Sequence, residues 1–508
     1  MLYNYIKCPH RVRLDLFGDY SKQDPISVFV KLLWEKGTDF EKQVIKSLEL
    51  PFLDLSFYSG MEKEKQTKEA IDRGVELIYG GRISAEGLVG EPDLLRKEGK
   101  GYLSGDIKSG SGLEGENDTS EGKLKPHYAV QLALYTDILE RLGKSGGRTP
   151  FIWDIKGREI EYDLNSPQNT RKLESWWIRY ENCLEAVSKI ANQGLKTLPA
   201  YSGICKLCQW RTYCFRCLKK SDDLTLIPEL GRVKRDVMIS YIDSVSDFAT
   251  FDLEMFKRKN KTIFPGIGIN SLQKFQERAI LLSKKDSQPY LKEQVILPDA
   301  PTELFFDIET DPLRDICYLH GFLERRNRDT NTERYVSFFS DQPNEEEEKQ
   351  AFGKAWEFIQ KSMPCIIYYY SPYEKTRWKK LQEKYPEVMS EDDIERMFNS
   401  GYAVDLYHDV VKKKTEWPTN DYSIKTLASY LGFRWRDSSP SGAESIEWYH
   451  RWVETGDENI KKRILQYNED DCIATRVLLE GICSLPLWNG LGSGFTSSHF
   501  NLNSFIII

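Results

Sequence analysis

The sequence has no long apolar run and no sign of a leader. Its longest apolar stretches, around Glu303–Phe306 and at Phe505–Ile508, fall far short of the roughly 18 residues that a membrane-spanning helix requires. The opening residues MLYNYIKCPHRVRLDLF lack the apolar segment and the small-residue cleavage site of a secretory signal peptide. We therefore expect a cytoplasmic protein without a membrane partner.

Two further features are missing. Ten cysteines in a chain of 508 residues are too few for a disulfide scaffold. Gly143-Lys-Ser145 has the ending of a phosphate-binding loop, but Ile138 stands where the first glycine of that loop is required. ATP binding at this place is excluded, so any helicase that acts with the chain must be a separate protein.

The chain also lacks a positive charge overall, since its formal net charge is −7. This argues against a histone-like binder, although carboxylates gathered in metal sites would also lower the charge of a nucleic-acid enzyme. Locally, the segment KLCQWRTYCFRCLKK (206–220) carries no acid, and five cations alternate with aromatic residues: Lys206, Arg211, Arg216, Lys219 and Lys220. This mixture suits phosphates and stacked bases, and it suits a solvated basic face equally well.

The length of the chain predicts more than one domain, because about 100 to 200 residues fill an ordinary core. Strands that alternate with helices predict an α/β, multidomain protein. We place a first domain at residues 1–220, a helical spacer at 221–299, a second α/β domain at 300–485 and a tail at 486–508. Pro298-Asp-Ala-Pro301 marks the linker before the second α/β domain.

The spacing of the cysteines is the main clue to the first domain. Cys8 stands alone, and Cys205-x2-Cys208-x5-Cys214 follows nearly two hundred residues later. A single distant thiolate can complete a four-cysteine metal site only if the fold brings the two ends of the domain together. Cys217 leaves an alternative open, because Cys205, Cys208, Cys214 and Cys217 could form a zinc site, and unligated core cysteines are the third option.

Two acids and a lysine lie between these cysteines. Asp93 and the pair Asp106 and Lys108 suit adjacent strands of a hairpin, in which alternation puts Asp106 and Lys108 on one face while Ile107 points into the core. A metal that lowers the pKa of water, together with a cation near the nucleophile, is what phosphodiester hydrolysis needs at neutral pH. The pattern therefore predicts a metal-dependent hydrolase site.

The ordered motifs Glu91-Pro-Asp93, Asp106-Ile-Lys108 and Gln131-x3-Tyr135 resemble the RecB-like branch of the PD-(D/E)xK nuclease superfamily. The resemblance covers roughly residues 1–215 and implies a restriction-endonuclease-like core. It implies that Asp93 and Asp106 bind Mg²⁺ or Mn²⁺ and that Lys108 positions the attacking water. It also implies that Gln131 and Tyr135 support the site.

One position departs from this family. The family usually has a histidine beside a glutamate on its first helix, whereas Gly37-Thr-Asp-Phe40-Glu41 keeps only the glutamate. Glu41 is implied as a metal ligand, and Phe40 replaces a second one. The full activity of this site is therefore in question.

The cysteines extend the resemblance to the CRISPR-associated and helicase-linked iron-sulfur nucleases of the same superfamily. In those proteins a lone N-terminal cysteine joins a C-terminal trio. The resemblance implies a structural [4Fe-4S] cluster on Cys8, Cys205, Cys208 and Cys214.

A second set of acids lies in the later domain. Asp307-Ile-Glu309 at the end of a predicted strand puts two carboxylates on one face, and Tyr467-x3-Asp471 sets a phenol and an acid one helical turn apart. This resembles the ribonuclease-H-like DEDD exonucleases of the proofreading type, over roughly residues 301–484. The resemblance implies Asp307, Glu309 and Asp471 as ligands of two metal ions and Tyr467 as the group that orients water.

The middle motif differs from that family. Where an aspartate usually follows an aromatic residue, this chain has Tyr370-Ser-Pro-Tyr373-Glu374, so Glu374 is the candidate fourth acid. Asp405 is a further candidate, and a cap at a strand end is an equally good interpretation of it. Asp470 is interpreted as a neighbour of the site.

Residues 221–299 contain a weak internal repeat, in which a turn with proline and glycine twice precedes an apolar-periodic helix. Each half resembles a helix-hairpin-helix, and Pro265-Gly-Ile-Gly268 would expose backbone N–H groups to a phosphate. The first copy has Glu229 where the glycine usually stands. The alternative is a helical spacer without contacts to nucleic acid.

Together these motifs predict a metal-dependent exonuclease that acts on single-stranded DNA or DNA ends in DNA processing, repair or defence. A separate helicase, or CRISPR or repair proteins, would be its partners. Two alternatives stay open: a nucleic-acid-binding scaffold with one or both sites attenuated, which Phe40 and Glu374 suggest, and an RNA-processing exonuclease, because DEDD chemistry does not distinguish the sugars.

Overall fold

The computed structural model describes residues 1–48, 50–115, 122–169 and 172–488. Most of the predicted tail, from residue 489 on, lies outside these residues. The chain forms two compact units. One comprises Met1–Leu272, Glu309–Ile316 and Ser439–Ile464; the other comprises Gln273–Ile308, Cys317–Ser438 and the residues from Leu465 on. These limits differ from the domain limits at residues 220, 299 and 485, which stay predictions.

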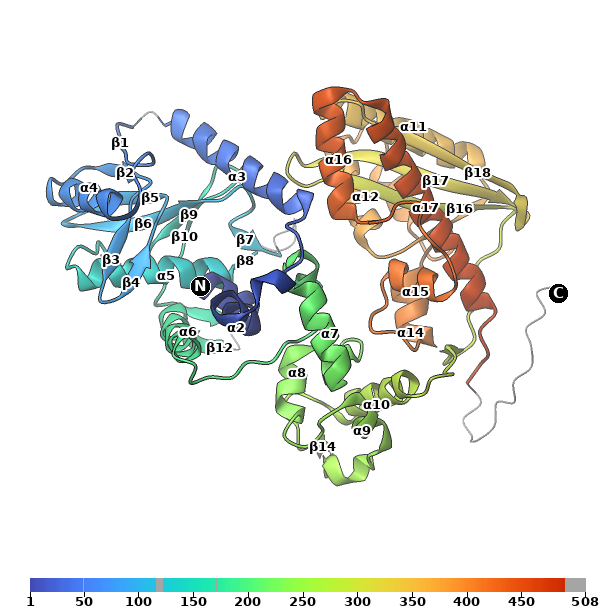
Figure 1. Cartoon of the computed structure of the whole chain (residues 1–508). Coiled ribbons are helices and arrows are strands. Elements are labelled where there is room, and N and C mark those ends of the chain that lie inside the picture. The colour runs from blue at the N-terminus through green and yellow to red at the C-terminus, as the bar shows by residue number, and fades with distance from the viewer. Residues whose placement is uncertain (49, 116–121, 170–171, 489–508) are drawn as a thin grey trace. The chain divides into compact units, whose positions relative to one another are not determined.

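The N-terminal part is built on a six-stranded mixed sheet with the order β1-β2-β5-β6-β9-β10 (Figure 1). Its strands are β1 (Leu53–Asp54), β2 (Leu77–Tyr79), β5 (Leu94–Glu98), β6 (Gly101–Ile107), β9 (Phe151–Trp153) and β10 (Glu159–Glu161). Three smaller pairs are β3 (Ile83–Ala85) with β4 (Leu88–Gly90), β7 (Leu113–Glu114) with β8 (Lys123–Leu124), and β11 (Pro167–Asn169) with β12 (Lys172–Ser175). The helices are α1 (Leu2–Lys7), α2 (Pro9–Phe17), α3 (Val28–Lys46), α4 (Gly60–Asp72), α5 (Pro126–Arg141), α6 (Trp176–Ala191) and α7 (Arg211–Ser221), with short 3-10 turns at Tyr20–Lys22 and Gly203–Leu207.

Strand alternation explains why this sheet is covered on both faces. Leu94 and Leu103 join one apolar cluster, which includes Ile45 of α3, while Leu95 and Tyr102 join the cluster formed with α5 and α6. Figure 1 shows α3 and α5 on opposite sides of the strands. The hairpin of β5 and β6 is antiparallel, with Leu94 opposite Gly105, as the acidic motifs predicted. It is therefore a rigid base for the residues at its open end.

The spacer contains two turns that share one left-handed residue directly after a proline. Its elements are a 3-10 turn at Leu224–Leu226, α8 (Gly231–Met238), α9 (Val245–Thr250), a 3-10 turn at Leu253–Phe256, the pair β13 (Lys257–Arg258) and β14 (Lys261–Thr262), and α10 (Ile269–Ser283). Glu229 before α8 and Gly266 before α10 have φ angles of +65° and +76°. The next residues, Leu230 and Ile267, are both buried. The weak repeat in the sequence thus corresponds to a turn that is repeated in part, because Gly231 has a φ of +69° whereas its counterpart Gly268 is not left-handed.

Glu229 occupies a backbone conformation that suits glycine. A left-handed conformation costs a residue with a Cβ atom about 1–2 kcal/mol, and glycine avoids this cost. A Cβ atom on Gly266 or Gly268 would meet no heavy atom within 4 Å, so the second turn is open on its outer side.

The C-terminal part has a five-stranded sheet with the order β18-β17-β16-β19-β20. Its strands are β16 (Thr302–Asp311), β17 (Ile316–Arg326), β18 (Asp329–Phe339), β19 (Cys365–Tyr369) and β20 (Ala403–Asp405), and β15 (Tyr290–Leu291) pairs with β21 (Thr415–Glu416). The helices are α11 (Glu345–Ser362), α12 (Tyr373–Lys384), α13 (Glu391–Met397), a π-helical turn at Leu406–Val411, α14 (Lys412–Lys414), α15 (Ile424–Tyr430), α16 (Gly442–Thr455) and α17 (Glu458–Cys483).

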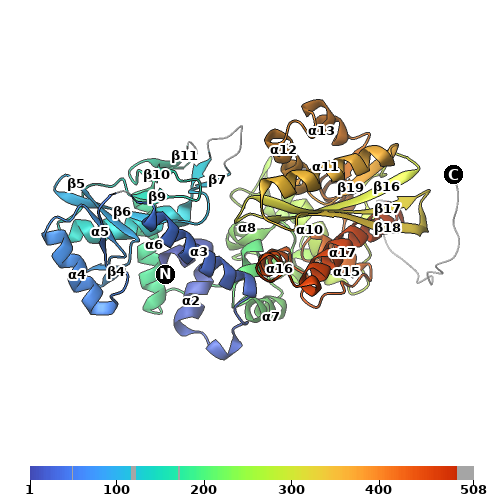
Figure 2. The same ribbon diagram turned by 90° about the horizontal axis from the view of Figure 1, so that it is seen from above.

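The central strand β16 sets the direction of its acids by the same alternation. Leu304 and Phe306 lie in the cluster that includes residues of α11 and α12, whereas Phe305 lies in the cluster with residues of α15 and α17. Figure 2 shows these two pairs of helices on opposite faces of the sheet. Asp307 and Glu309 have the parity of Phe305, so they face α17. None of the helices in the described residues combines the length and the apolar character needed to cross a membrane.

Candidate active sites

The first site lies at the end of the hairpin of β5 and β6. Asp93 precedes β5, Asp106 lies in β6 and Lys108 follows it. The Lys108 Nζ atom is 2.8 Å from Asp106 Oδ2 and 4.0 Å from Asp93 Oδ2. Asp93 Oδ2 also accepts a hydrogen bond of 2.8 Å from the backbone N–H of Ile107. The structure thus brings the two acids and the lysine together, on the elements that the sequence predicted.

The two acids of this site repel each other, and both attract Lys108. Burial raises the pKa of Asp93 well above its ordinary value, and the nearby Asp106 carboxylate raises it further. Burial alone would lower the pKa of Lys108, but Asp106 and Asp93 raise it above its ordinary value, so Lys108 keeps its charge. Two carboxylates with a single fixed ammonium group suit a divalent cation, which would remove the remaining repulsion.

Glu41 approaches the same site from α3. Its Oε1 atom accepts a 2.8 Å hydrogen bond from the Tyr79 hydroxyl, and its charge contributes to the raised pKa of Asp93. Phe40, in contrast, packs against the apolar cluster of Leu94 and Leu103. No metal ligand stands at the Phe40 position. Among the described residues, Glu41, Asp93 and Asp106 do not bring ligand atoms within 4.8 Å of one another.

Gln131 and Tyr135 hold the chain beside Asp93. Gln131 Nε2 donates a 2.8 Å hydrogen bond to the Tyr135 hydroxyl, which donates in turn to the Glu91 carbonyl oxygen at 3.4 Å. A Cβ atom at Gly90 would lie 2.5 Å from the Tyr135 ring, so only glycine allows this contact. Both residues therefore act on the position of the backbone that carries Asp93.

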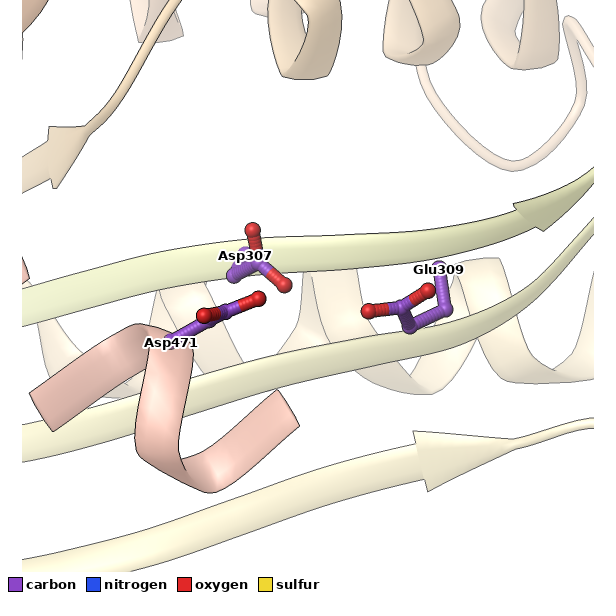
Figure 3. Close-up of side chains that lie close together, drawn as sticks. All are labelled: Asp307, Glu309 and Asp471. Carbon is purple, nitrogen blue, oxygen red and sulfur yellow. The ribbon is translucent and has the colours of Figure 1, made fainter. Parts of the chain in front are cut away.

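The second site is the tightest acidic cluster in the described residues. Ligand oxygens of Asp307, Glu309 and Asp471 all lie within 4.8 Å of one another. Figure 3 shows the carboxyl groups from β16 and α17 turned toward a common point. Three carboxylates at this spacing are a donor set suited to Mg²⁺ or Mn²⁺. The residues present therefore fit the metal ions that the resemblance implies.

Neutral donors and one cation hold this cluster. Asn468 Nδ2 donates to Asp307 Oδ2 at 2.7 Å, and Trp435 Nε1 donates to Asp471 Oδ1 at 2.7 Å. Burial raises the pKa of Asp471, whereas Lys425 and the hydrogen bonds from Trp435 and Tyr467 oppose the rise. Gly321 is required beside Asn468, because a Cβ atom there would lie 1.6 Å from Asn468 Oδ1.

Lys425 is a site residue that the sequence analysis missed. Its Nζ atom lies 2.6 Å from the Tyr467 hydroxyl and 4.7 Å from the centre of the Tyr467 ring. Asn468 could have been found, since it shares a helix face with Asp471 at a spacing of three residues. Lys425 and Trp435 are distant in sequence from the three acids of the cluster, and no local sequence pattern indicates that they belong to the site.

The other predicted acids occupy different places. Glu374 is buried on α12, accepts from the Ser371 hydroxyl at 3.3 Å and lies outside the three-carboxylate cluster. Burial raises the pKa of Glu374 well above its ordinary value, and the charges of Asp405 and Asp471 add to the rise. Asp405 caps the following π-helical turn, accepting from the His408 N–H at 2.9 Å. Asp470 accepts two 2.8 Å hydrogen bonds from Arg436.

Four cysteines surround one pocket in the N-terminal part. Cys8, Cys205, Cys208 and Cys214 line it, and Cys217 is not among its lining residues. Burial raises the pKa of Cys214 to about 12, and the thiols of Cys208, Cys8 and Cys205 add to the rise. Sequence positions about two hundred residues apart thus meet at one place.

The donor set of this pocket fits a group that takes four thiolates. Arg232 Nη2 lies 3.1 Å from Cys8 Sγ, and Arg11 and Arg211 also line the pocket, so positive charge is available to offset thiolates. No three of these sulfur atoms lie within 4.8 Å of one another in the described residues.

Comparison with known families finds one nuclease superfamily in each part of the chain. Residues 29–215 match the model of the PD-(D/E)XK nuclease superfamily, and residues 304–483 match the model of the RNase_H superfamily. No curated protein and no solved structure matches the chain. Asp93, Asp106 and Lys108 fall within the first match, and Asp307, Glu309 and Asp471 fall within the second.

Replacing Asp93 with asparagine should stabilise the metal-free protein while it removes a metal ligand. Because the folded state raises the pKa of Asp93, its ionisation opposes folding, and this penalty appears as the pH rises through the raised pKa. We expect Asp93→Asn to gain about 0.5–2 kcal/mol at pH 7 and to lose this gain as the pH falls below the ordinary aspartate pKa. Thermal unfolding in EDTA at several pH values measures it. Asp39→Asn, on the exposed face of α3, is the matched control; an equal effect of both variants would contradict the prediction.

Lys425→Gln should reduce the turnover of the C-terminal site about 10²-fold, because Tyr467 and Asp471 lose their cation. The acid limb of the pH profile should also move to higher pH, since Lys425 lowers the pKa of Asp471. Turnover is measured with Lys108→Ala as background, so that the first site is silent. Lys425→Arg should retain most activity, and Lys462→Gln, exposed on α17, is the control. An unchanged pH profile would leave Lys425 without this role.

Proposed function

We propose that this metal-dependent nuclease, which joins a PD-(D/E)XK superfamily domain to an RNase_H superfamily domain, is an exonuclease on single-stranded DNA or DNA ends. The observation that carries the proposal is the convergence of Asp307, Glu309 and Asp471 within 4.8 Å. A convergence of this kind is suited to two-metal hydrolysis of a phosphodiester bond. The enzyme would act in DNA processing, repair or defence.

In the C-terminal site, Asp307, Glu309 and Asp471 would hold the metal ions, and Glu374 is the candidate for a fourth contact. Bound Mg²⁺ or Mn²⁺ would supply an activated water and a charge opposite the leaving oxygen. The chain's own groups orient the rest: Tyr467 lies next to Asp471, and its hydroxyl is fixed by Lys425 at 2.6 Å. A fixed phenol can hold one lone pair of water in a single direction.

In the N-terminal site, Asp93 and Asp106 would hold a metal ion with help from Glu41. Lys108 is placed to hold a water or a phosphate oxygen, because its ammonium group keeps its charge beside both acids. Phe40 favours a weaker second candidate, in which this domain holds nucleic acid and cleaves it slowly. The packing of Phe40 among apolar side chains is the observation behind that candidate.

The cysteine pocket supports a structural [4Fe-4S] cluster on Cys8, Cys205, Cys208 and Cys214. A cluster there would tie α1 to α7 and so close the domain at both ends. The paired turns before α8 and α10 support helix-hairpin-helix contacts to a DNA backbone, since Gly266 and Gly268 are open. The exposed cations of α7, among them Arg211, Arg216 and Lys220, support the same partner.

We propose a cytoplasmic protein that receives single strands from a separate helicase or from CRISPR or repair proteins, because the chain has no complete phosphate-binding loop of its own.

The nuclease proposal is tested by digestion of end-labelled oligonucleotides with Mg²⁺ or Mn²⁺. We expect EDTA to abolish cleavage. Lys108→Ala should reduce the cleavage by the first site, and Asp307→Ala should reduce the cleavage by the second site, each by about 10²-fold or more. Single-stranded DNA, duplex DNA and single-stranded RNA of one sequence decide the substrate, and labels at either end decide the polarity. Lys65→Ala, an exposed lysine of α4, is the control. If a chain that carries both Lys108→Ala and Asp307→Ala digests DNA as fast as the unaltered chain, neither site is a nuclease.

The cluster proposal is tested on anaerobically purified protein by absorption spectrum and by iron and zinc content. Cys8→Ala should lose or alter the iron-sulfur absorption, and Cys217→Ala should leave it unchanged, because Cys8 and not Cys217 lines the pocket. Zinc without iron, or an unchanged spectrum in Cys8→Ala, would refute the assignment of Cys8 to the cluster.

A further inference from the structure

Three lysines and three aromatic rings gather beside the first site, where α1 meets the N-terminus of α5. The Lys125 Nζ atom lies 5.2 Å from the centre of the Tyr128 ring, and Lys108 Nζ lies 5.7 Å from the same centre on the side of the acids. Lys7 Nζ lies 5.9 Å from the centre of the Tyr3 ring. The catalytic lysine of the sequence pattern is therefore one member of a larger cationic group.

A buried histidine joins the two tyrosines. The ring centres of His127 and Tyr3 lie 4.8 Å apart, and those of His127 and Tyr128 lie 4.5 Å apart. Both contacts are edge-to-face, the geometry in which aromatic pairs attract one another. His127 is buried, whereas Tyr3 is 37% exposed. Tyr3 thus presents an aromatic surface to solvent on a fixed support.

Among the described residues, Lys7 and Lys125 lack a close acidic partner, whereas Lys108 pairs with Asp106. Neither Lys7 nor Lys125 forms an ion pair within 4.0 Å with a described carboxylate. Glu114 acts on both lysines from a greater distance, and Asp154 acts in the same way on Lys125. The Lys125 ammonium instead donates to the Ser111 carbonyl oxygen at 2.7 Å. Lys125 also precedes the first turn of α5, whose dipole adds positive potential at that end.

The electrostatics agree with this geometry. Burial and the charges of Lys7, Lys125 and Lys108 lower the pKa of His127 to about 3, so its ring is neutral at physiological pH. Burial, and then the charge of Lys7, lower the pKa of Lys125. Like charges held together in this way are relieved by an anion.

We propose that Tyr3, Lys7, Lys125 and Tyr128 form a subsite for the nucleotide next to the one that is cleaved in a single strand of DNA. Lys7 and Lys125 receive its phosphate, and the exposed face of Tyr3 stacks on its base. Lys108 links this subsite to the metal ligands, since it contacts both Tyr128 and Asp106. The proposal rests on the nuclease function and names how its first domain selects a substrate.

The aromatic surface selects single strands over duplexes. A base can stack on a protein ring only after it leaves its own stack, and such contacts tolerate any sequence because every base has a flat face. The phosphate contacts add affinity that depends on salt and not on sequence. We therefore infer that the first domain takes strand ends or gaps without a base preference.

Binding of a labelled single-stranded oligodeoxynucleotide to the full chain in EDTA tests the subsite. Tyr3→Ala should weaken binding roughly tenfold. Lys125→Gln should weaken binding and reduce the slope of log affinity against log salt by about 0.7, as the loss of one phosphate contact does. Lys7 is left unaltered, because it also lines the cysteine pocket.

Matched variants separate stacking and charge from folding. Tyr3→Phe and Lys125→Arg should bind as the unaltered chain does, and Lys65→Gln on α4 controls for the loss of one exposed lysine. Tyr3→Leu keeps apolar bulk against His127 without an aromatic face, so it should bind as weakly as Tyr3→Ala. Duplex DNA of the same sequence should bind equally to Tyr3→Ala and to the unaltered chain.

Cleavage measured in parallel distinguishes this proposal from the nuclease function. If Tyr3→Ala, Tyr3→Leu and Lys125→Gln keep the melting temperature, the affinity and the kcat/KM of the unaltered chain, the subsite is overturned while the nuclease stands. If no nucleic acid is cleaved but single-strand binding depends on Tyr3 and Lys125, the subsite stands and the nuclease function fails.

Discussion

Repulsion between carboxylates held close together is the constraint on which both sites depend. A buried pair of acids is costly unless a cation or hydrogen-bond donors offset it. In the first site this repulsion is offset by Lys108, which lies near both Asp93 and Asp106 at the same strand end. In the second site the repulsion is offset by the hydrogen-bond donors Asn468 and Trp435 and, from a greater distance, by the charge of Lys425. The first site thus places its positive charge between the two acids, whereas the cation of the second site, Lys425, contacts the Tyr467 hydroxyl.

The acids themselves were predictable because strand alternation is local. Asp106 with Lys108 at the end of β6, and Asp307 with Glu309, stand two residues apart, which puts each pair on one face in any sheet. The predicted strand end at Asp307 was wrong, because β16 continues to Asp311. The helix pattern of Tyr467 and Asp471 is equally local. The three-carboxylate cluster follows once β16 is central and α17 covers its odd-numbered face, as the alternating cores of Leu304 and Phe305 show. The paired turns of the spacer were also visible as a repeat.

The partners of the acids were not predictable, because they arrive through tertiary contacts. Lys425 lies on α15 and reaches Tyr467 across 42 positions in the chain. Glu374 shows the opposite case: its motif places it after a strand, yet its carboxylate is outside the three-acid cluster. The subsite around Tyr3 depends on α1 meeting α5, and no spacing in the sequence relates residues 3 and 127. Local patterns identify the reacting groups, while long-range packing selects what surrounds them.

The backbone turn at Glu229 makes the two halves of the spacer unequal. Its two halves share a left-handed residue after the proline, but the first half has a carboxylate at this residue where the second has an open glycine. A polyanion that approached both turns would be attracted by one and repelled by the other. Two equivalent binding turns would let a nucleic-acid strand move in either direction with the same free energy. One binding turn beside a repulsive turn would distinguish the two directions. A single residue that costs folding stability would thus let a repeated turn distinguish the two directions of a bound strand.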